Sequence, residues 1–413
     1  MTSDAALPLA GLRVLDLSRI LAGPVCTQIL ADLGADVVKV ERPGIGDDTR
    51  QWGPPFLEAN AEETAAGRPG PSAYFLSCNR GKRSLALDLS KPASRAVLDD
   101  LLRTADVMLE NFLPDASERL GLSPERLREV NPKLVSCAIS GFGRTGPMRD
   151  VPGYDLAIQA SAGLMSITGE PDGAPMKVGV AISDIVTGLY AAISVLAGLI
   201  GRGARGEGRA FDVALADCTL ASLVNVVQST LVTGRAPVRY GNAHPQIVPY
   251  EAFATADGHL VLAVGADRQW RRFCEAIGRD TWAEDTRFAA NPARVANRDV
   301  LVPLVAHVMC ERTTAEWEKL LAAADVPHAC VATVDQAVAT PQTEARAMVR
   351  EVVDSTGRTF RVVGSPIHWP RRPESQVAPP PQLGEHSEEV LRGWLGYNDE
   401  RLKHLRAEGA IGS

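Results

Sequence analysis

The chain has 413 residues, of which 45% are hydrophobic and 23% are charged. This composition excludes a wholly disordered chain, and the length predicts two or three domains. The net charge is −7 and no basic stripe occurs along the sequence, so nucleic acid is not an expected partner.

The N-terminus lacks the charged and apolar regions of a secretory signal, and the longest apolar stretch, Ile185–Ile200, is too short to span a bilayer. The seven cysteines lie far apart, with no C-x-x-C pair and no histidine at metal-ligand spacing. We therefore expect a cytoplasmic protein with no metal site and no membrane partner.

The chain begins with the pattern of a β-α-β unit. Short apolar runs typical of buried strands occur at Val14–Leu17 and Val37–Glu41, and the helix between them begins near Pro24 and ends at Gly34. The alternation then continues through a helix capped by Ser90 that runs to Leu102, a strand Val107–Leu109, a helix opening at Ser123 and a strand Leu134–Ile139. Such alternation predicts a doubly wound α/β domain with a parallel sheet.

The remaining segments are more varied. A polar loop is expected over 58–71, a long apolar helix over about 184–200 and a flexible surface turn over 201–209. Two hairpins are predicted, Tyr250–Thr255 with His259–Val264 and Val352–Asp354 with Thr359–Val363. Further helices are expected at Arg268–Ile277, Thr314–Ala324 and, last in the chain, Ser387–Leu395.

A dinucleotide site is the first function to test against this pattern, because Glu41 ends the second strand, where an acid can hold a ribose. The first turn contains only Gly23 where G-x-G-x-x-G needs three glycines, so an NAD-dependent oxidoreductase is not expected. Arg42 suits adenine stacking or a phosphate, although residue type alone favours an ordinary surface arginine.

Six segments in order resemble the class III CoA-transferase family, which includes formyl-CoA transferase and the carnitine CoA-transferases. They are LAGPVCTQILADLGADVVKVERPGIGDDTR, NRGKRSLALDLSKP, ADVMLENFLPDASERLGL, SGFGRTGP, PGYDLAIQASAGLMSITG and LGEHSEEVL. The resemblance implies an interlocked homodimer with a Rossmann-like large domain from both chain ends (1–205 and 330–413), a linker over 206–240 and a smaller α+β domain over 241–329. It also implies CoA transfer through a covalent aspartyl intermediate, with CoA thioesters as substrates and no tightly bound cofactor.

The resemblance assigns the nucleophile to Asp184. This residue lies at the start of the long apolar helix, where unpaired N–H groups and the helix dipole favour an anion, so we expect an ionised carboxylate. Without the resemblance, a plain N-cap aspartate would be the favoured interpretation. Asp155 matches an acidic residue near the nucleophile, and it also fits a turn aspartate.

The other site residues follow from the same resemblance. Those assigned to CoA binding are Ile20, Ala22, Arg42, Leu87, Lys91, Asn111, Phe112 and Arg119. Ser90 and Pro152 replace lysines of formyl-CoA transferase, while Arg19 and Leu21 replace its histidine and glutamine, so specificity for oxalate or formate is not expected.

The segment GNAHPQIVPYEAF resembles the branch of succinate–hydroxymethylglutarate CoA-transferase, which acts on dicarboxylic acids. His244 would then lie near the acyl group, although a lone loop histidine is equally typical of a structural residue. Arg19, and after it Arg50, could pair with a remote carboxylate. We therefore expect a succinyl-CoA or other dicarboxylyl-CoA transferase.

Two other functions compete with this prediction. An acyl-CoA racemase shares the fold but needs a histidine before the acid that matches Asp155, and Tyr154, a poor base near neutral pH, stands there. A non-catalytic CoA-binding protein would be expected to lack Asp184, which is present.

Overall fold

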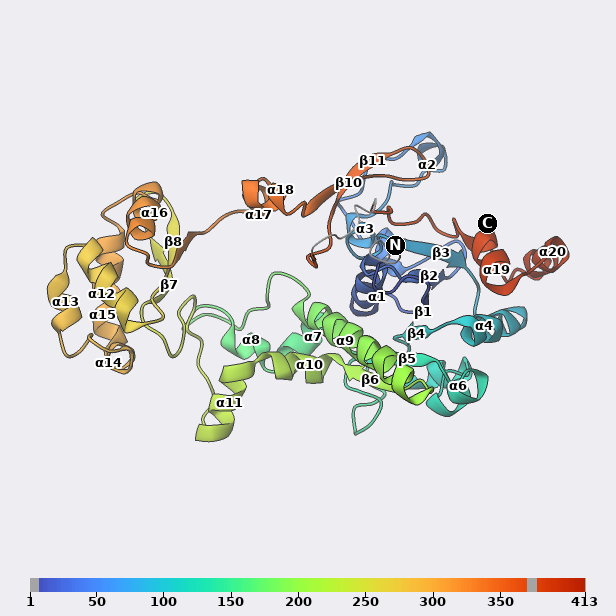
Figure 1. Ribbon diagram of the computed structural model, residues 1–413, viewed down its shortest axis with the longest axis horizontal. Coiled ribbons are helices and arrows are strands. Elements are labelled where there is room, and N and C mark those ends of the chain that lie inside the picture. Colours follow the sequence, from blue (N-terminus) through green and yellow to red (C-terminus); the bar gives the residue numbers. More distant parts are fainter. Residues whose placement is uncertain (1–6, 370–376, 413) are drawn as a thin grey trace, which may run out of the picture. The chain divides into compact units, whose positions relative to one another are not determined.

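The fold is described from a computed structural model for residues 7–369 and 377–412 (Figure 1). The chain divides into two compact units. The first consists of the chain up to Leu164, Val178–Gln228 and the chain from Gln342, and the second of Met165–Lys177 and Ser229–Pro341. The stretch 206–240, expected as a linker, contains one strand and two helices, and its residues belong partly to each unit.

The first unit contains a six-stranded parallel sheet with the strand order β3-β2-β1-β4-β5-β6. In β1, Leu15 lies opposite Val38 of one neighbour and Met108 of the other. The order reverses beside β1, as in doubly wound α/β folds, so the predicted parallel sheet is confirmed. The strands are β1 (Arg13–Asp16), β2 (Asp36–Glu41), β3 (Lys82–Ala86), β4 (Val107–Glu110), β5 (Val135–Ser140) and β6 (Ala210–Ala214).

The sequence does not predict β3 and β6. β3 begins with Lys82, Arg83 and Ser84, which do not form an apolar run, yet Lys82 is fully buried because it pairs with Asp16. β6 follows a glycine-rich stretch, and only its last two residues are buried. In both strands a partner distant in sequence, rather than local hydrophobicity, determines the conformation.

Helices cover both faces of the sheet (Figure 1). One apolar cluster contains residues of α1 (Ala22–Asp32), α7 (Asp155–Ser161), α9 (Ile182–Arg205) and α10 (Leu215–Ser222). The cluster on the opposite face contains residues of α4 (Pro92–Thr104), α6 (Pro124–Val130), α19 (Ser387–Leu395) and α20 (Asp399–Ala407). The end of the chain thus completes a core begun by its first strands.

The helix ends agree with the sequence in part. Ser123 caps α6 as predicted, because its Oγ accepts a hydrogen bond from the N–H of Arg126 at 3.3 Å. Ser90 does not cap α4: Lys91 is the N-cap residue, and the Ser90 hydroxyl donates to Asp88 instead. α19 is not the last helix, since α20 follows it.

Helix α9 is longer than the sequence predicts. It runs on through Arg205, so most of the stretch 201–209 is helical rather than a loose turn, and Gly206 ends it at φ 78°. By length and composition alone this helix could cross a membrane. Its buried residues Ala191, Ala192 and Val195 nevertheless belong to the apolar cluster that α9 shares with α1, α7 and α10, as in a core helix.

The first unit also contains shorter elements. The region 58–71, expected as a loop, includes α2, which is stabilised by a capping box between Asn60 and Glu63. The predicted hairpin near the chain end is confirmed as β10 and β11. These elements are η1 (Asp48–Gln51), α2 (Ala61–Ala65), α3 (Ala73–Cys78), α5 (Pro114–Arg119), β10 (Val349–Val353) and β11 (Thr359–Val363).

The second unit has its own core around an antiparallel sheet of β7 (Tyr250–Ala254), β8 (His259–Ala263) and β9 (His328–Cys330). The predicted hairpin and the two predicted helices are confirmed. The helices are α12 (Asp267–Ala276), α13 (Asp280–Glu284), α14 (Asn291–Ala296), α15 (Arg298–Met309), α16 (Thr314–Ala323) and α17 (Val334–Val338). Three helices lie at the unit boundaries: α8 (Leu164–Ile167), α11 (Val224–Thr233) and α18 (Pro341–Ala345).

Candidate active site

A cavity of about 440 Å³ opens at the carboxyl edge of the parallel sheet. Open α/β sheets bind their ligands at this edge, near the reversal of strand order. The loops after four strands line the cavity, with Leu17 and Arg19 after β1, Arg42 and Asp47 after β2, Leu87 after β3 and Phe112 after β4. Four residues predicted for CoA or the active site, Arg19, Arg42, Leu87 and Phe112, therefore border one cavity.

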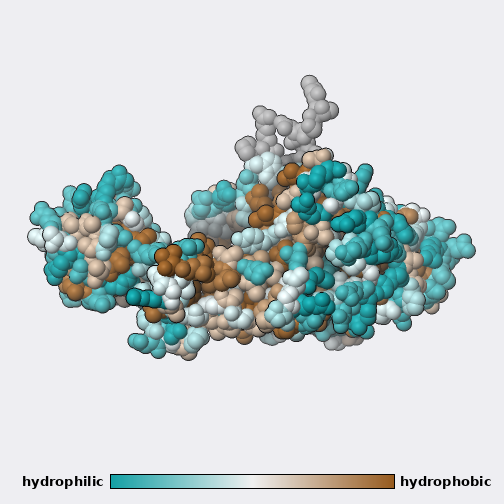
Figure 2. All heavy atoms as spheres, turned by 90° about the horizontal axis from the view of Figure 1, so that it is seen from below, coloured by the Kyte–Doolittle hydropathy of each residue, from teal (hydrophilic) through white to brown (hydrophobic). Residues whose placement is uncertain are grey.

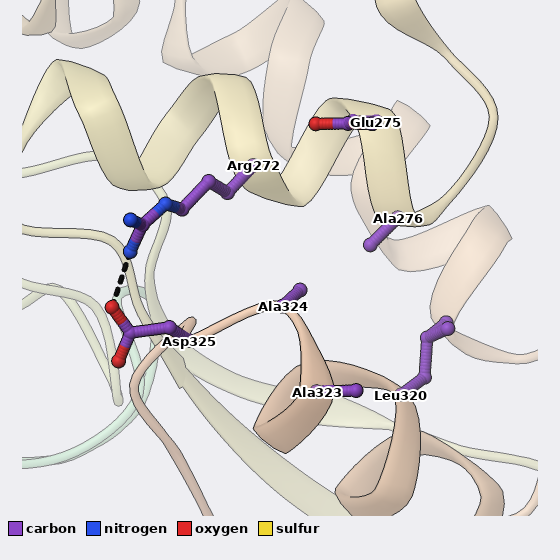
Figure 3. A pocket seen from close by; sticks show the side chains of 7 residues that line it. All are labelled: Arg272, Glu275, Ala276, Leu320, Ala323, Ala324 and Asp325. Atoms are coloured by element: carbon purple, nitrogen blue, oxygen red, sulfur yellow. Dashed lines mark hydrogen bonds and ion pairs between the residues drawn. The ribbon is translucent and has the colours of Figure 1, made fainter.

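Another cavity, of about 470 Å³, lies between α12 and α16 in the second unit (Figure 3). Its lining consists mainly of alanine and leucine side chains, with Glu275 and an ion pair between Arg272 and Asp325. Apart from these charged groups it offers no reactive side chain, so it is a weaker candidate than the cavity at the sheet edge.

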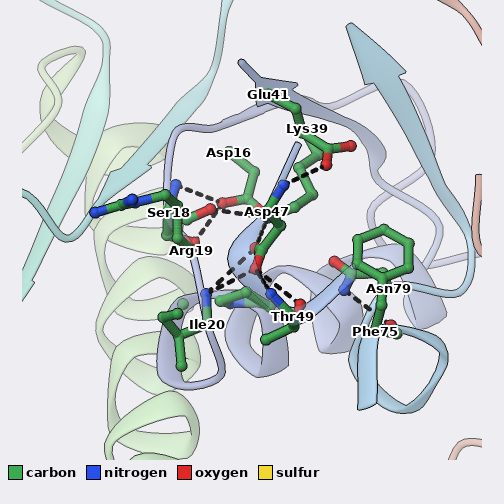
Figure 4. A network of polar contacts seen from close by, with 12 residues as sticks. Asp16, Ser18, Arg19, Ile20, Lys39, Glu41, Asp47, Thr49, Phe75 and Asn79 are labelled. Carbon is green, nitrogen blue, oxygen red and sulfur yellow. Dashed lines mark hydrogen bonds and ion pairs between the residues drawn. The ribbon is translucent and has the colours of Figure 1, made fainter. Parts of the chain in front are cut away.

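A buried network of charges lies next to the sheet-edge cavity (Figure 4). Lys39 Nζ is 2.8 Å from Asp47 Oδ2, and Lys82 Nζ is 3.2 Å from Asp16 Oδ2; all four side chains are fully buried. Although burial alone raises the pKa of Asp47, Lys39 outweighs burial and lowers the pKa to about 2. The ion pair between Lys39 and Asp47 is therefore charged at neutral pH.

The turn that follows β1 has an unusual backbone. Ile20 has a φ of 72°, in the left-handed region that β-branched residues rarely adopt. Its N–H donates to Asp47, while the side-chain amide of Asn111 accepts from the N–H of Arg19 at 3.0 Å and donates to its carbonyl at 2.9 Å. Asn111, predicted to bind CoA, thus holds the main chain of a cavity-lining residue.

The three arginines considered from the sequence differ in availability. The Arg19 guanidinium is about half exposed and pairs with Asp48 at 3.1 Å, and Arg42 is exposed at the cavity. Arg50 is not available for a substrate, because it donates two 2.7 Å hydrogen bonds to Glu41 and stacks on the ring of Phe75. The suggestion that Arg50 binds a remote carboxylate is therefore wrong.

Asp184 lies in the first turn of α9, but it does not cap that helix. Asp155 does so instead, since its Oδ1 accepts from the N–H of Ser183 at 2.8 Å and from the N–H of Asp184 at 3.4 Å. Burial, together with the charge of Asp155, raises the pKa of Asp184 to about 7. The expectation that the helix end keeps Asp184 fully ionised is thus wrong, because Asp155 occupies that end.

Sequence reasoning missed two residues beside these carboxyl groups. Gln159 is fully buried; its amide nitrogen donates to Asp155 Oδ2 at 2.7 Å, and its oxygen accepts from the N–H of Val178 at 2.9 Å. Tyr74 lies in α3, and burial together with the charge of Asp184 raises the pKa of Tyr74 to about 12. Tyr74 lies outside the six family segments, whereas Gln159 lies within one of them, and its place one helical turn after Asp155 could have identified it.

Helix α9 packs tightly on the start of α1. A Cβ at Gly188, one turn after Asp184, would come within 2.7 Å of the carbonyl oxygen of Ala22. Ala22 is the first residue of α1 and directly follows Leu21, the buried N-cap residue. The turn beside the cavity and the helix that carries Asp184 are thus in direct contact.

The other predicted residues lie elsewhere. Lys91 and Arg119 are exposed and do not line the sheet-edge cavity. His244 belongs to the second unit, where its Nδ1 accepts from the N–H of Gln246 at 3.0 Å and its ring packs on Tyr250. Tyr154, which stands where an acyl-CoA racemase needs a histidine, is 68% exposed. The roles of Lys91, Arg119 and His244 remain predictions.

The sheet-edge cavity and the acidic residue at the start of α9 agree with the resemblance noted in the sequence, and comparison with known proteins establishes the class. Residues 9–387 match CoA-transferase family III. The chain belongs to this family and is a CoA-transferase.

Relatives of known name match over nearly the whole chain. The succinate–glutarate CoA-transferase of Agrobacterium fabrum is 46% identical over 93% of this chain and 95% of its own. The succinyl-CoA:mesaconate CoA-transferase of Haloarcula hispanica is 40% identical over 92% of this chain and 94% of its own. Among solved structures, a CAIB/BAIF family protein from Brucella suis is 40% identical, covers 94% of this chain and all of its own, and has a TM-score of 0.81.

Proposed function

We propose that this CoA-transferase moves CoA between dicarboxylic acids, with succinyl-CoA or another dicarboxylyl-CoA as donor and Asp184 as the nucleophile. The observation that carries the role of Asp184 is its position in α9. Asp184 lies one helical turn before Gly188, and at Gly188 this helix contacts Ala22, the residue that ends the cavity-lining turn. Its pKa of about 7 supports this role, since a carboxylate of raised basicity is the stronger nucleophile.

The proposed reaction keeps the energy of the thioester. A carboxylate oxygen of Asp184 attacks the carbonyl carbon of the donor thioester, and the C–S bond breaks to give a mixed anhydride and CoA thiolate. The thiolate then attacks the aspartyl carbonyl carbon, which releases the donor acid and leaves an aspartyl-CoA thioester. The acceptor carboxylate reverses the two steps and restores Asp184. Water must be excluded, because it would hydrolyse the anhydride.

The acceptor class rests on the named relatives, whose acids, succinate, glutarate and mesaconate, all carry two carboxyl groups. In this chain Arg19 is the candidate partner for the second carboxylate, because its guanidinium is accessible at the cavity and, among the described residues, pairs with the half-exposed Asp48. A guanidinium fork pairs well with a carboxylate.

We also propose a homodimer, interlocked as the family resemblance implies, in the cytoplasm and without nucleic-acid or membrane partners. Large apolar side chains on α9 support a partner surface: Leu189, Tyr190, Ile193 and Ile200 are all exposed, the last by 79%. In the view of Figure 2, hydrophobic side chains form a local brown patch among largely hydrophilic ones. Apolar patches of this kind mark protein interfaces.

The test of the proposed function is a CoA-exchange assay followed by mass spectrometry. The protein receives succinyl-CoA and one acid at a time: glutarate, hydroxymethylglutarate, malate, itaconate, oxalate, formate, acetate or carnitine. A new CoA ester of a dicarboxylic acid is expected. If only α-deuterium exchange into a branched acyl-CoA occurs, the protein is a racemase and the proposal is wrong.

Asp184→Ala should abolish transfer, by at least roughly 10³-fold, while free CoA still binds, because only the nucleophile is removed. Calorimetry with CoA measures the binding. Asp217→Ala is the matched control, since Asp217 also lies in the first turn of a helix but is exposed. Turnover of Asp184→Ala near that of the control would exclude the aspartyl intermediate.

A further inference from the structure

The turn Ser18–Ala22 joins β1 to α1 through a strained residue. Ile20 has a φ of 72°, where its branched side chain crowds the backbone. Such a conformation persists only where surrounding groups hold it, and it concentrates at functional sites. The contacts of this turn therefore show which groups hold it.

Asp47 contacts the N–H of the strained residue directly, while Asn111 binds the carbonyl of Arg19 in the same peptide group. Both carboxylate oxygens of Asp47 accept from the N–H of Ile20, at 3.2 and 3.3 Å. The same carboxylate accepts from the N–H and the hydroxyl of Thr49, at 3.0 and 2.7 Å. These bonds orient Asp47 towards the turn (Figure 4).

Lys39 connects Asp47 to the other end of the turn. Its Nζ is 2.8 Å from Asp47 Oδ2 and also donates to the carbonyl of Ser18 at 2.8 Å. The Lys39 and Asp47 side chains are both fully buried, so solvent does not weaken the pair. Glu41 fixes the main chain of Asp47 by accepting its N–H at 2.9 Å.

We propose that Asp47 is a positioning residue for CoA transfer, which holds Ile20 in the left-handed conformation and so fixes the turn between the cavity and the helix of the nucleophile. The turn presents Arg19 to the cavity and leads into Ala22, whose carbonyl packs against Gly188 of α9. This inference rests on the proposed function, because it assigns the turn a part in CoA transfer.

Asp47→Asn tests the proposal. The amide keeps the size of the side chain but removes the charge that pairs with Lys39. We expect kcat to fall by roughly 10–100-fold, because small displacements of reacting groups are costly, with affinity for free CoA changed by less than about threefold. In hydrogen exchange followed by mass spectrometry, the peptide that contains Ile20 should exchange faster.

Asp36→Asn is the matched control. Asp36 begins β2, at the opposite end of the strand from the cavity, and pairs with Arg83. Like Asp47→Asn, this variant removes one carboxylate charge and breaks an ion pair that involves a residue of β2. It should nevertheless leave kcat within about twofold of the wild type and the hydrogen exchange of the Ile20 peptide unchanged. An equal loss of kcat in both variants would overturn the proposal.

A second comparison isolates the strain itself. In the Asp47→Asn background, Ile20→Gly should recover more kcat than Ile20→Ala, because glycine adopts a positive φ without steric cost. Glycine no better than alanine would contradict the role of Asp47. Should Asp47→Asn not fold, Asp47→Glu, which displaces the carboxylate by one methylene, takes its place in both comparisons.

The hydrogen-exchange measurement separates the proposed function from the proposed role of Asp47. If the wild-type protein transfers no CoA, the proposed function fails, whereas protection of the Ile20 peptide still decides whether Asp47 holds the turn. If transfer occurs and Asp47→Asn keeps both kcat and protection, only the role of Asp47 fails.

Discussion

Asp155 and Asp184 show how one carboxyl group changes the chemistry of another. Asp155 accepts the free N–H groups at the start of α9, so the positive end of that helix faces Asp155 rather than Asp184. Asp184 is left partly buried beside a negative charge, which raises its pKa. A carboxyl group of this kind gains nucleophilic strength at the cost of being partly protonated near neutral pH.

The pH dependence of transfer should follow this shift. Because the pKa of Asp184 is raised to about 7, the nucleophilic carboxylate is lost as the pH falls through 7, and kcat/KM should decrease about tenfold for each further pH unit. Initial rates between pH 5 and pH 9 check this expectation. A flat profile down to pH 5 would mean that Asp184 titrates near its usual value of 3.8.

The same shift predicts an opposite effect on stability. The folded protein binds the Asp184 proton more tightly than the unfolded chain, so ionisation of Asp184 costs stability as the pH rises from about 4 to about 7. Asp184→Asn should therefore raise Tm above that of the wild type at pH 8, and the gain should shrink towards pH 4. Thermal unfolding without ligand measures the difference.

The site residues could be predicted from the sequence only in part. The family resemblance locates Asp184 and the cavity residues Arg42 and Phe112, because their motifs are local. The resemblance does not reveal that Asn111 binds the main chain of Arg19, which lies 92 positions earlier in the sequence. Nor does it reveal that Asp155 caps α9 by accepting from Ser183, which lies 28 positions later. Such pairings arise when separate loops meet at the sheet edge, and no local pattern encodes them.

At the scale of elements, the contact between α1 and α9 determines where Asp184, the proposed nucleophile, lies. Gly188 allows the helices to approach, because the space that a Cβ would fill is occupied by the Ala22 carbonyl and the Val25 side chain. The sequence predicts both helices from their apolar patterns and ends. It cannot predict this close approach, just as it cannot predict β3, whose lysine is buried by a partner 66 positions away.

Gly188→Ala should push α9 away from α1 and reduce kcat by roughly tenfold or more, with a lower Tm, because backbone rather than a flexible side chain blocks the new methyl group. Gly203→Ala is the control in the same helix, since nothing lies within 4 Å of its Cβ position. That variant should keep full activity and gain stability from the better helix propensity of alanine. Equal behaviour of the two variants would exclude the packing role of Gly188.

At the scale of the whole molecule, α9 carries exposed apolar side chains of the kind that a partner subunit would cover. Leu189, Ile193 and Ile200 recur at helical spacing on a helix that also packs into the core through Ala191, Ala192 and Val195. An isolated chain would leave this face in water, which favours the proposed homodimer.

Sedimentation should therefore give twice the chain mass of 44.0 kDa. If the subunits are interlocked, a tagged and an untagged dimer mixed under native conditions should not exchange subunits, because threaded chains cannot separate without unfolding. Refolding the mixture from denaturant should yield mixed dimers. A monomer at micromolar concentration would contradict the dimer, and rapid native exchange would contradict the interlocking.

The position of α19 and α20 has a consequence for the newly made chain. These helices supply Val390, Leu391 and Trp394 to the core whose first members are Leu15 and Leu17, so that core stays incomplete until α19 and α20 have been synthesised. Most of the second unit is one continuous stretch, Ser229–Pro341, and can close while synthesis continues. The nascent chain thus carries a first unit whose apolar core is incomplete while its second unit can already be folded, and a chain that stops before α19 should expose that core to water.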